Sequence, residues 1–111
     1  MLRLERRAQR NREVDLRKYE TLLIIRPDVD EEDLKSLLEE VKNIISQQGG
    51  RVTGVDNWGV RRLEYPIKRE EKGRYAVVNF EGGGSAIKEI ERVMKIKDEV
   101  LRTKTILIEG D

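Results

Sequence analysis

The sequence has 111 residues, of which 37% are hydrophobic and 41% are charged, and its formal net charge is +1 at pH 7. This length fits one domain with a modest core, and the patterned apolar residues indicate a folded chain. The absence of Cys and His excludes disulfides, thiolate zinc sites and the commonest catalytic bases, and no apolar run reaches the roughly 20 residues of a membrane span.

The first predicted segment is a basic N-terminal arm over residues 1–16. Residues 1–18 hold seven Lys or Arg against three Asp or Glu, whereas the rest of the chain holds 16 basic against 19 acidic residues. Such an arm on a mildly acidic body points to nucleic acid or another acidic surface as its target. A solvated tail without function is the alternative. We expect RNA contacts from the arginines of this arm, namely Arg3, Arg6, Arg7 and Arg10.

A strand and a helix come next. Residues 19–26 alternate with a period of two and are apolar on both faces, which indicates a strand in the middle of a sheet. Residues 30–48 carry Leu, Val and Ile at helical spacing and predict an amphipathic helix, which the following Gly pair ends. Asp28 and Asp30 suit the positive end of its dipole. A calcium loop would need a central glycine that is missing here, so we expect helix capping.

A long strand follows over residues 52–67. Val52 and Val55 differ in parity, whereas Val55 and Leu63 share it. Because side chains alternate between the two faces of a strand, we expect a bulge near Gly54 and a long, bent strand.

Within this strand, residues 58–67 read WGVRRLEYPI. Alternation sends Arg61 and Arg62 to opposite faces, so one of them lies beside Leu63 and Tyr65. A guanidinium next to exposed aliphatic and aromatic groups suits a surface that meets a planar, polar partner. Surface solubility or an internal ion pair is the alternative for the two arginines. We predict a docking surface for a partner protein, formed by Trp58, Arg61, Arg62, Leu63 and Tyr65.

The remaining chain predicts a polar loop at 68–73, a strand at 74–81, a helix at 86–97 with Ser85 as its N-cap, and a last strand at 100–109. The glycine run before this helix lacks the spacing of a nucleotide-binding loop, which favours a flexible connection. The order is strand, helix, strand, strand, helix, strand. With right-handed crossovers it predicts an α+β, ferredoxin-like sandwich, a four-stranded antiparallel sheet with two helices on one face.

The inventory of side chains disfavours catalysis. Without His and Cys only carboxylate or lysine schemes remain, and the acidic residues fall on predicted helix faces and loops. We expect no enzyme, no cofactor, no metal, no membrane association and no small-molecule substrate. Residues 72–79 lack most aromatics of an RNA recognition motif, so base stacking on the sheet is not expected. A small self-pairing regulatory module of the same fold, holding a small ligand between subunits, stays the alternative function.

Two motifs together resemble the bacterial ribosomal protein S6 family. Residues 17–20 read RKYE and residues 59–67 read GVRRLEYPI, and the similarity runs from about Arg17 to the C-terminus. The resemblance implies a ferredoxin-like domain over residues 17–111 and a structural constituent of the small ribosomal subunit in the cytoplasm. It also implies binding to 16S ribosomal RNA together with ribosomal protein S18, during assembly of the central domain. Of the first motif, the expected RNA-binding residues are Arg17, Lys18 and Tyr19.

Overall fold

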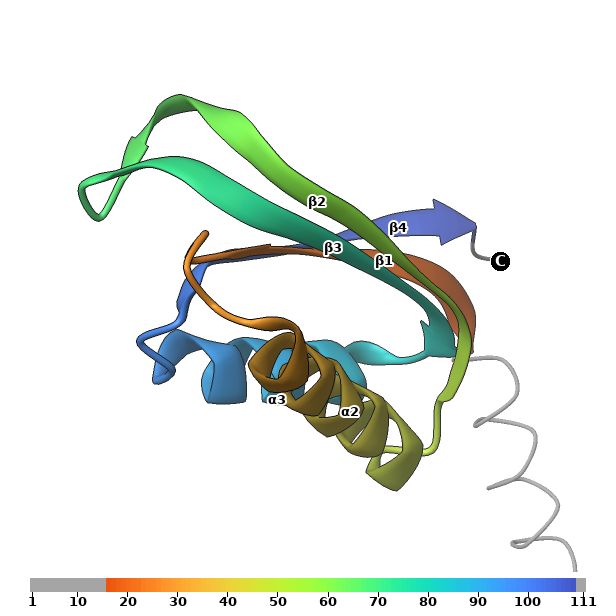
Figure 1. The fold of residues 1–111 in the computed structure, drawn as a ribbon. Coiled ribbons are helices and arrows are strands. Elements are labelled where there is room, and N and C mark those ends of the chain that lie inside the picture. Colours follow the sequence, from red (N-terminus) through yellow and green to blue (C-terminus); the bar gives the residue numbers. More distant parts are fainter. Residues whose placement is uncertain (1–15, 110–111) are drawn as a thin grey trace, which may run out of the picture.

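The computed structural model describes residues 16–109, which form a four-stranded antiparallel sheet with both helices on one face (Figure 1). The arm arginines Arg3, Arg6, Arg7 and Arg10 lie outside the described residues. The strand order is β2-β3-β1-β4, which confirms the ferredoxin-like sandwich. Neither described helix has the length and apolar character needed to cross a membrane. The elements are β1 (Arg17–Ile25), α2 (Glu31–Gln47), β2 (Arg51–Ile67), β3 (Glu70–Gly82), α3 (Gly84–Lys95) and β4 (Val100–Glu109).

The two helices begin differently. Asp30 caps α2 as predicted, because its Oδ1 accepts a 2.8 Å hydrogen bond from the backbone N–H of Asp33. The prediction that Ser85 caps the second helix is wrong. Gly83 is the N-cap, without a side-chain cap, and the backbone is already helical from Gly84, so Ser85 lies inside the first turn.

The main core lies between the sheet and the two helices. Thr21 is fully buried in this layer of the sheet, where its hydroxyl shares a 2.8 Å hydrogen bond with the hydroxyl of Thr105 on the neighbouring strand. This pairing satisfies a polar group that would otherwise be costly to bury. The buried side chains of this core are Leu23, Ile25, Leu34, Leu37, Val41, Ile44, Ile45, Val78, Phe80, Ala86, Ile90, Met94 and Val100.

Strand β2 is long and irregular. One register shift lies beside Gly54 and confirms the predicted bulge. A second shift makes Trp58 an extra residue opposite β3, next to Gly59, whose φ of +79° suits glycine. This second bulge reverses the alternation of side chains. Val55 therefore packs on the helix side of the sheet and Leu63 on the helix-free side, although the two residues have the same parity.

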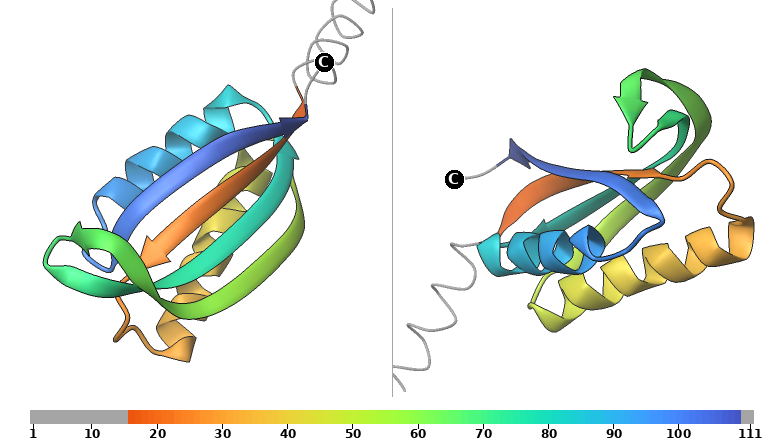
Figure 2. Two further views of the ribbon diagram at one scale, coloured as in Figure 1. Left: turned by 90° about the horizontal axis from the view of Figure 1, so that it is seen from above. Right: turned by 90° about the vertical axis from the view of Figure 1, so that its left-hand side faces the viewer.

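The loop predicted over residues 68–73 is a turn of only two residues, Lys68 and Arg69, and β3 already starts at Glu70. The hairpin of β2 and β3 thus extends past the helices. We call its outer part, residues 60–74, the distal hairpin. Figure 2 shows this part curling over the helix-free face of the sheet. Between the pairs Arg62 with Lys72 and Ile67 with Glu70, β2 has four residues against one on β3, so its chain leaves the ladder there.

Candidate docking face

Tyr75, Trp58 and Arg61 form a stack of side chains on the helix-free face of the sheet, which we call the open face. The ring of Trp58 lies over that of Tyr75, with centroids 6.3 Å apart and planes 10° from parallel. The guanidinium of Arg61 also lies over the Trp58 ring, 5.1 Å from its centroid. Trp58 remains 43% exposed, as its place in the predicted docking surface requires. The stack holds an aromatic ring and a cation in a fixed position on a rigid sheet.

A groove runs beside the stack, beneath the distal hairpin. Its floor is a small apolar cluster in which Ile24, Leu63 and Leu101 are buried. Gly73 permits the close approach of β3, because a Cβ there would lie 2.5 Å from the Cγ2 of Ile24. The groove has a volume of about 220 Å³ and is lined by Leu22, Ile24, Leu63, Glu64, Tyr65, Ile67, Tyr75, Arg102 and Lys104.

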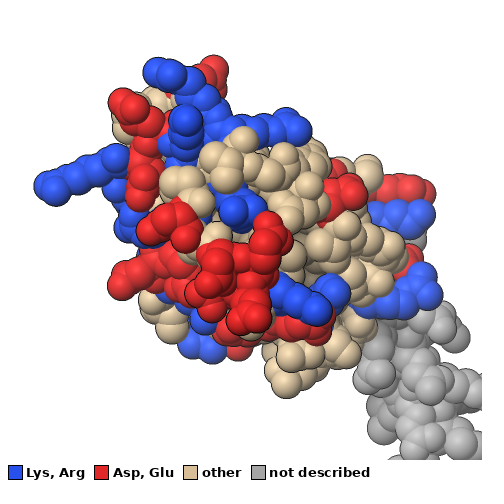
Figure 3. Space-filling model, viewed as in Figure 1, with Lys and Arg blue, Asp and Glu red and all other residues tan. Residues whose placement is uncertain are grey.

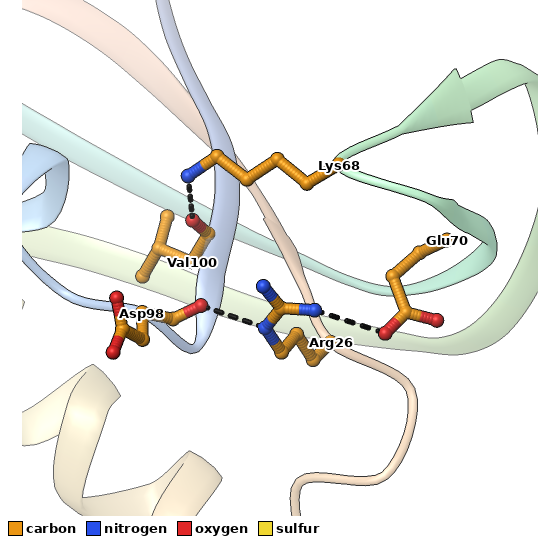
Figure 4. A network of polar contacts seen from close by, with 5 residues as sticks. All are labelled: Arg26, Lys68, Glu70, Asp98 and Val100. Atoms are coloured by element: carbon orange, nitrogen blue, oxygen red, sulfur yellow. Dashed lines mark hydrogen bonds and ion pairs between the residues drawn. The ribbon is translucent and has the colours of Figure 1, made fainter.

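Polar contacts connect the distal hairpin to the end of β1 and the start of β4. Arg26 donates one hydrogen bond to the carboxylate of Glu70, at 3.0 Å, and one to the backbone carbonyl of Asp98, at 2.8 Å (Figure 4). Lys68 reaches across to the carbonyl of Val100 at 3.4 Å. These contacts come from the end of β1 and the start of β4. The hairpin is therefore tied down at its tip and does not project freely into solvent.

The residues predicted to bind a partner protein do not all lie on one surface of the structure. Trp58, Arg61 and Tyr65 are exposed on the open face. Arg62 pairs with Lys72 across the hairpin and points to the opposite side, so it does not share a surface with Arg61. Leu63 is only 7% exposed, so little of its side chain is accessible to a partner. The curl of the hairpin buries it in the floor of the groove.

Within residues 16–109 neither Arg61 nor Arg62 has a carboxylate within 4.0 Å. The alternative of an internal ion pair is thus not supported for either arginine. Both side chains are exposed. The open face also holds groups that the sequence pattern did not single out, since only the tertiary fold brings them together: Tyr75, Arg102, Lys104 and Ile106.

The residues predicted to touch RNA lie where β1 begins. Arg17 is exposed and, with Tyr19, lines a hollow of about 690 Å³ between the end of α2 and the start of α3. Lys18 lies on the other side of the strand and forms an exposed 3.5 Å ion pair with Glu109. Tyr19 is half-buried and stacks on Phe80, with centroids 5.6 Å apart. The aromatic ring therefore serves packing, while the two cations stay accessible.

Glu89 and Arg92 on helix α3 form an ion pair that shifts the pKa of both groups. The clearest perturbation lies on the outer surface of α3, where Arg92 donates two hydrogen bonds, of 2.8 and 2.9 Å, to Glu89. These bonds hold the pKa of the Glu89 carboxyl below its usual range and raise the pKa of Arg92. Residues 16–109 contain no cluster of three or more Asp or Glu side chains placed to hold a metal ion.

Comparison with known proteins gives a consistent result. The family model described as Ribosomal protein S6 matches residues 18–107, which is most of the chain. The chain belongs to the ribosomal protein S6 family. The small ribosomal subunit protein bS6 of Caldanaerobacter subterraneus subsp. tengcongensis is 44% identical over 87 residues, covering 78% of this chain and 92% of that protein. The corresponding protein of Geobacter metallireducens is 42% identical over 96 residues, covering 86% and 81%.

A solved structure agrees with the fold. The crystal structure of 30S ribosomal protein S6 from Thermotoga maritima superposes with a TM-score of 0.76 at 34% sequence identity, covering 83% of this chain and 87% of that one. Members of the S6 family are structural proteins of the small ribosomal subunit, which places this chain on the ribosome in the cytoplasm. The family does not support the alternative of a self-pairing regulatory module.

Proposed function

We propose that this S6 family member binds 16S ribosomal RNA together with ribosomal protein S18 and so supports assembly of the central domain of the small subunit. The observation that carries the proposal is the stack of Tyr75, Trp58 and Arg61 on the open face. Exposed Trp and Arg side chains, held rigidly, are the residue types that dominate binding energy at protein interfaces. The open face is therefore the docking face for S18.

The charges on this face suit a basic protein partner. Register places Glu20 opposite Asn79 and Asp56 opposite Val77, so both carboxylates lie on the open face. Neither belongs to an ion pair within residues 16–109. Ile106 adds exposed apolar surface beside Glu20. An apolar centre with free carboxylates around it complements a small basic protein.

The RNA contacts that we propose for the described domain lie at the beginning of β1. Arg17 and Lys18 are the accessible cations there, and the arm before them continues with Arg3, Arg6, Arg7 and Arg10. Because the net charge of the whole chain is only +1, few phosphates are neutralised by this chain alone. The basic partner supplies most of the affinity for the RNA backbone.

The proposal includes the absence of enzymatic activity and of a cofactor. It is supported by a sequence without His or Cys, which lacks the side chains that most acid/base and nucleophilic schemes use.

A comparison of neighbouring arginines tests the docking face. Purified chain and purified S18 should form a one-to-one complex in light scattering and calorimetry. Arg61→Ala should weaken that complex roughly tenfold, because it removes an exposed anchor of the interface. Arg62→Ala is the matched control, since it removes the same side chain one residue away on the opposite side. An equal loss for both variants, or no loss for Arg61→Ala, would contradict the proposal.

A further inference from the structure

The side of the distal hairpin that points away from the open face, which we call its outer side, carries two cations in an unfavourable arrangement. Arg62 of β2 and Lys72 of β3 are direct cross-strand partners, and both are exposed. Like charges directly opposite each other destabilise a strand pair. Within residues 16–109 neither side chain has a carboxylate at ion-pair distance, whereas Arg74, farther from the tip on the same side, is paired with Glu31 at 3.2 Å. Among the described residues this pair of cations therefore has no compensating carboxylate.

The turn of the hairpin is also locally unfavourable. Lys68 and Arg69 have φ values of +48° and +71°. Two-residue turns of this left-handed kind strongly favour Asn-Gly or Asp-Gly, because other residues are rare at positive φ. Here both positions hold long cations instead. Residues that break a local rule without an internal gain are typical of functional surfaces.

The tip is nevertheless rigid. Arg26 binds Glu70, and Lys68 reaches the carbonyl of Val100, so both sides of the turn are fastened to the body of the domain (Figure 4). The Arg26 contact also neutralises one of the three carboxylates among residues 61–72, which include five Lys or Arg. Arg69 is exposed at the apex between these two attachments. A cation on a fixed support loses little freedom when it binds a ligand.

The chemistry of the tip favours phosphate over protein. Residues 68–72 read KREEK and contain no apolar side chain, and Lys is depleted from protein interfaces. Lys and Arg side chains are the usual contacts of nucleic acid backbones. Figure 3 shows Lys and Arg side chains projecting from the distal hairpin. Because Arg62 and Lys72 point away from the open face, they leave that face free for a partner protein.

From these observations we infer that Arg62, Arg69 and Lys72 form a second RNA contact, which binds backbone phosphates on the outer side of the distal hairpin. The inference rests on the proposed function, because it assumes that the chain meets ribosomal RNA in complex with S18. It adds a surface apart from the start of β1, at the opposite end of the sheet, and it moves Arg62 from protein docking to RNA binding.

The test measures the salt dependence of RNA affinity for the complex with S18 on a central-domain fragment of 16S RNA. The triple variant Arg62→Gln, Arg69→Gln, Lys72→Gln should reduce the slope of log affinity against log salt by about 2 to 3, since each lost phosphate contact contributes about 0.7 to 0.9. Its affinity for S18 should not change. The matched control is Lys35→Gln, Lys88→Gln, Lys95→Gln, which removes three exposed lysines from the helices and should leave the slope unchanged.

A slope that stays the same in the hairpin variant, or falls equally in the control, would overturn the inference while the proposed function stands. Loss of S18 affinity without a change in slope would also overturn it, because the surface would then dock protein. Absence of RNA binding by the wild-type complex would overturn both. Arg69→Gly separates binding from stability: it should raise the thermal midpoint of the free chain, because it relieves the turn, and yet weaken RNA binding. If the thermal midpoint and the RNA affinity instead rise together or fall together, an RNA role for Arg69 is contradicted.

Discussion

Arg102 of β4 donates a 2.7 Å hydrogen bond to the hydroxyl of Tyr65 of β2, although these strands form the two opposite edges of the sheet. The guanidinium also lies 5.9 Å from the centroid of the Tyr65 ring. The contact exists because the distal hairpin curls across the open face and brings one edge above the other. It therefore fixes the width of the groove next to the docking stack.

Tyr65→Phe should lower the free energy of unfolding by about 0.5 to 1.5 kcal/mol, because it removes one hydrogen bond and leaves the ring in place. Urea unfolding measures this change. A double-mutant cycle with Arg102→Gln should give a coupling energy of at least about 0.5 kcal/mol. Full additivity of the two substitutions would mean that the contact does not hold the hairpin.

Leu63→Ala should destabilise the protein by about 2 to 4 kcal/mol, because it opens a cavity in the floor of the groove. Val60→Ala is the control in the same strand, since Val60 is 45% exposed and packs little, and it should cost less than about 0.5 kcal/mol. Chemical denaturation of both variants provides the comparison. Equal costs would show that the hairpin does not close over Leu63.

The hydroxyl pair of Thr21 and Thr105 should behave non-additively. Thr105→Val alone should cost about 1 to 2 kcal/mol, because it leaves the hydroxyl of the fully buried Thr21 without its partner. The double change to Val at both positions should restore most of this loss, since no polar group is then left unpaired. Thermal unfolding of the two single variants and the double variant tests this. A double variant that loses the sum of the single costs would contradict the pairing.

Trp58→Ala should weaken binding to S18 by about 2 kcal/mol, or roughly 30-fold, as expected for a central aromatic anchor. Isothermal calorimetry measures this loss. Val60→Ala again serves as control, because it truncates an exposed apolar side chain two residues away on the other side of β2. Trp58→Phe should retain part of the affinity through stacking on Tyr75. A Trp58→Ala complex as tight as the wild type would place the interface elsewhere.

The sequence was sufficient for the order of the elements because each one carries a local signal. Apolar alternation marked β1, helical spacing and Asp30 marked α2, and a polar segment separated β2 from β3. The resulting ferredoxin-like sandwich is confirmed. Where local signals conflicted with tertiary packing, the predictions were wrong. The turn at Lys68 and Arg69 lacks the usual Asn-Gly, so its two-residue length could not be recognised.

The candidate site was harder to predict than the fold. Alternation correctly separated Arg61 from Arg62, but parity could not reveal that the bulge at Trp58 reverses the faces of β2. Leu63 was predicted as a surface residue because it neighbours the two arginines, whereas the curl of the hairpin over the open face buries it. Arg102 was missed because it joins the site only through contacts between strands that are distant in the sequence.

The most direct test of paired RNA binding is a titration of a central-domain fragment of 16S RNA with this chain alone and with its S18 complex, over a range of salt concentrations. We predict weak binding and a shallow salt slope for the chain alone, because its net charge is only +1, and much tighter binding with a steeper slope for the complex. Tight, sequence-specific binding by the chain alone, unchanged by S18, would contradict the proposal that the chain binds RNA mainly in complex with S18.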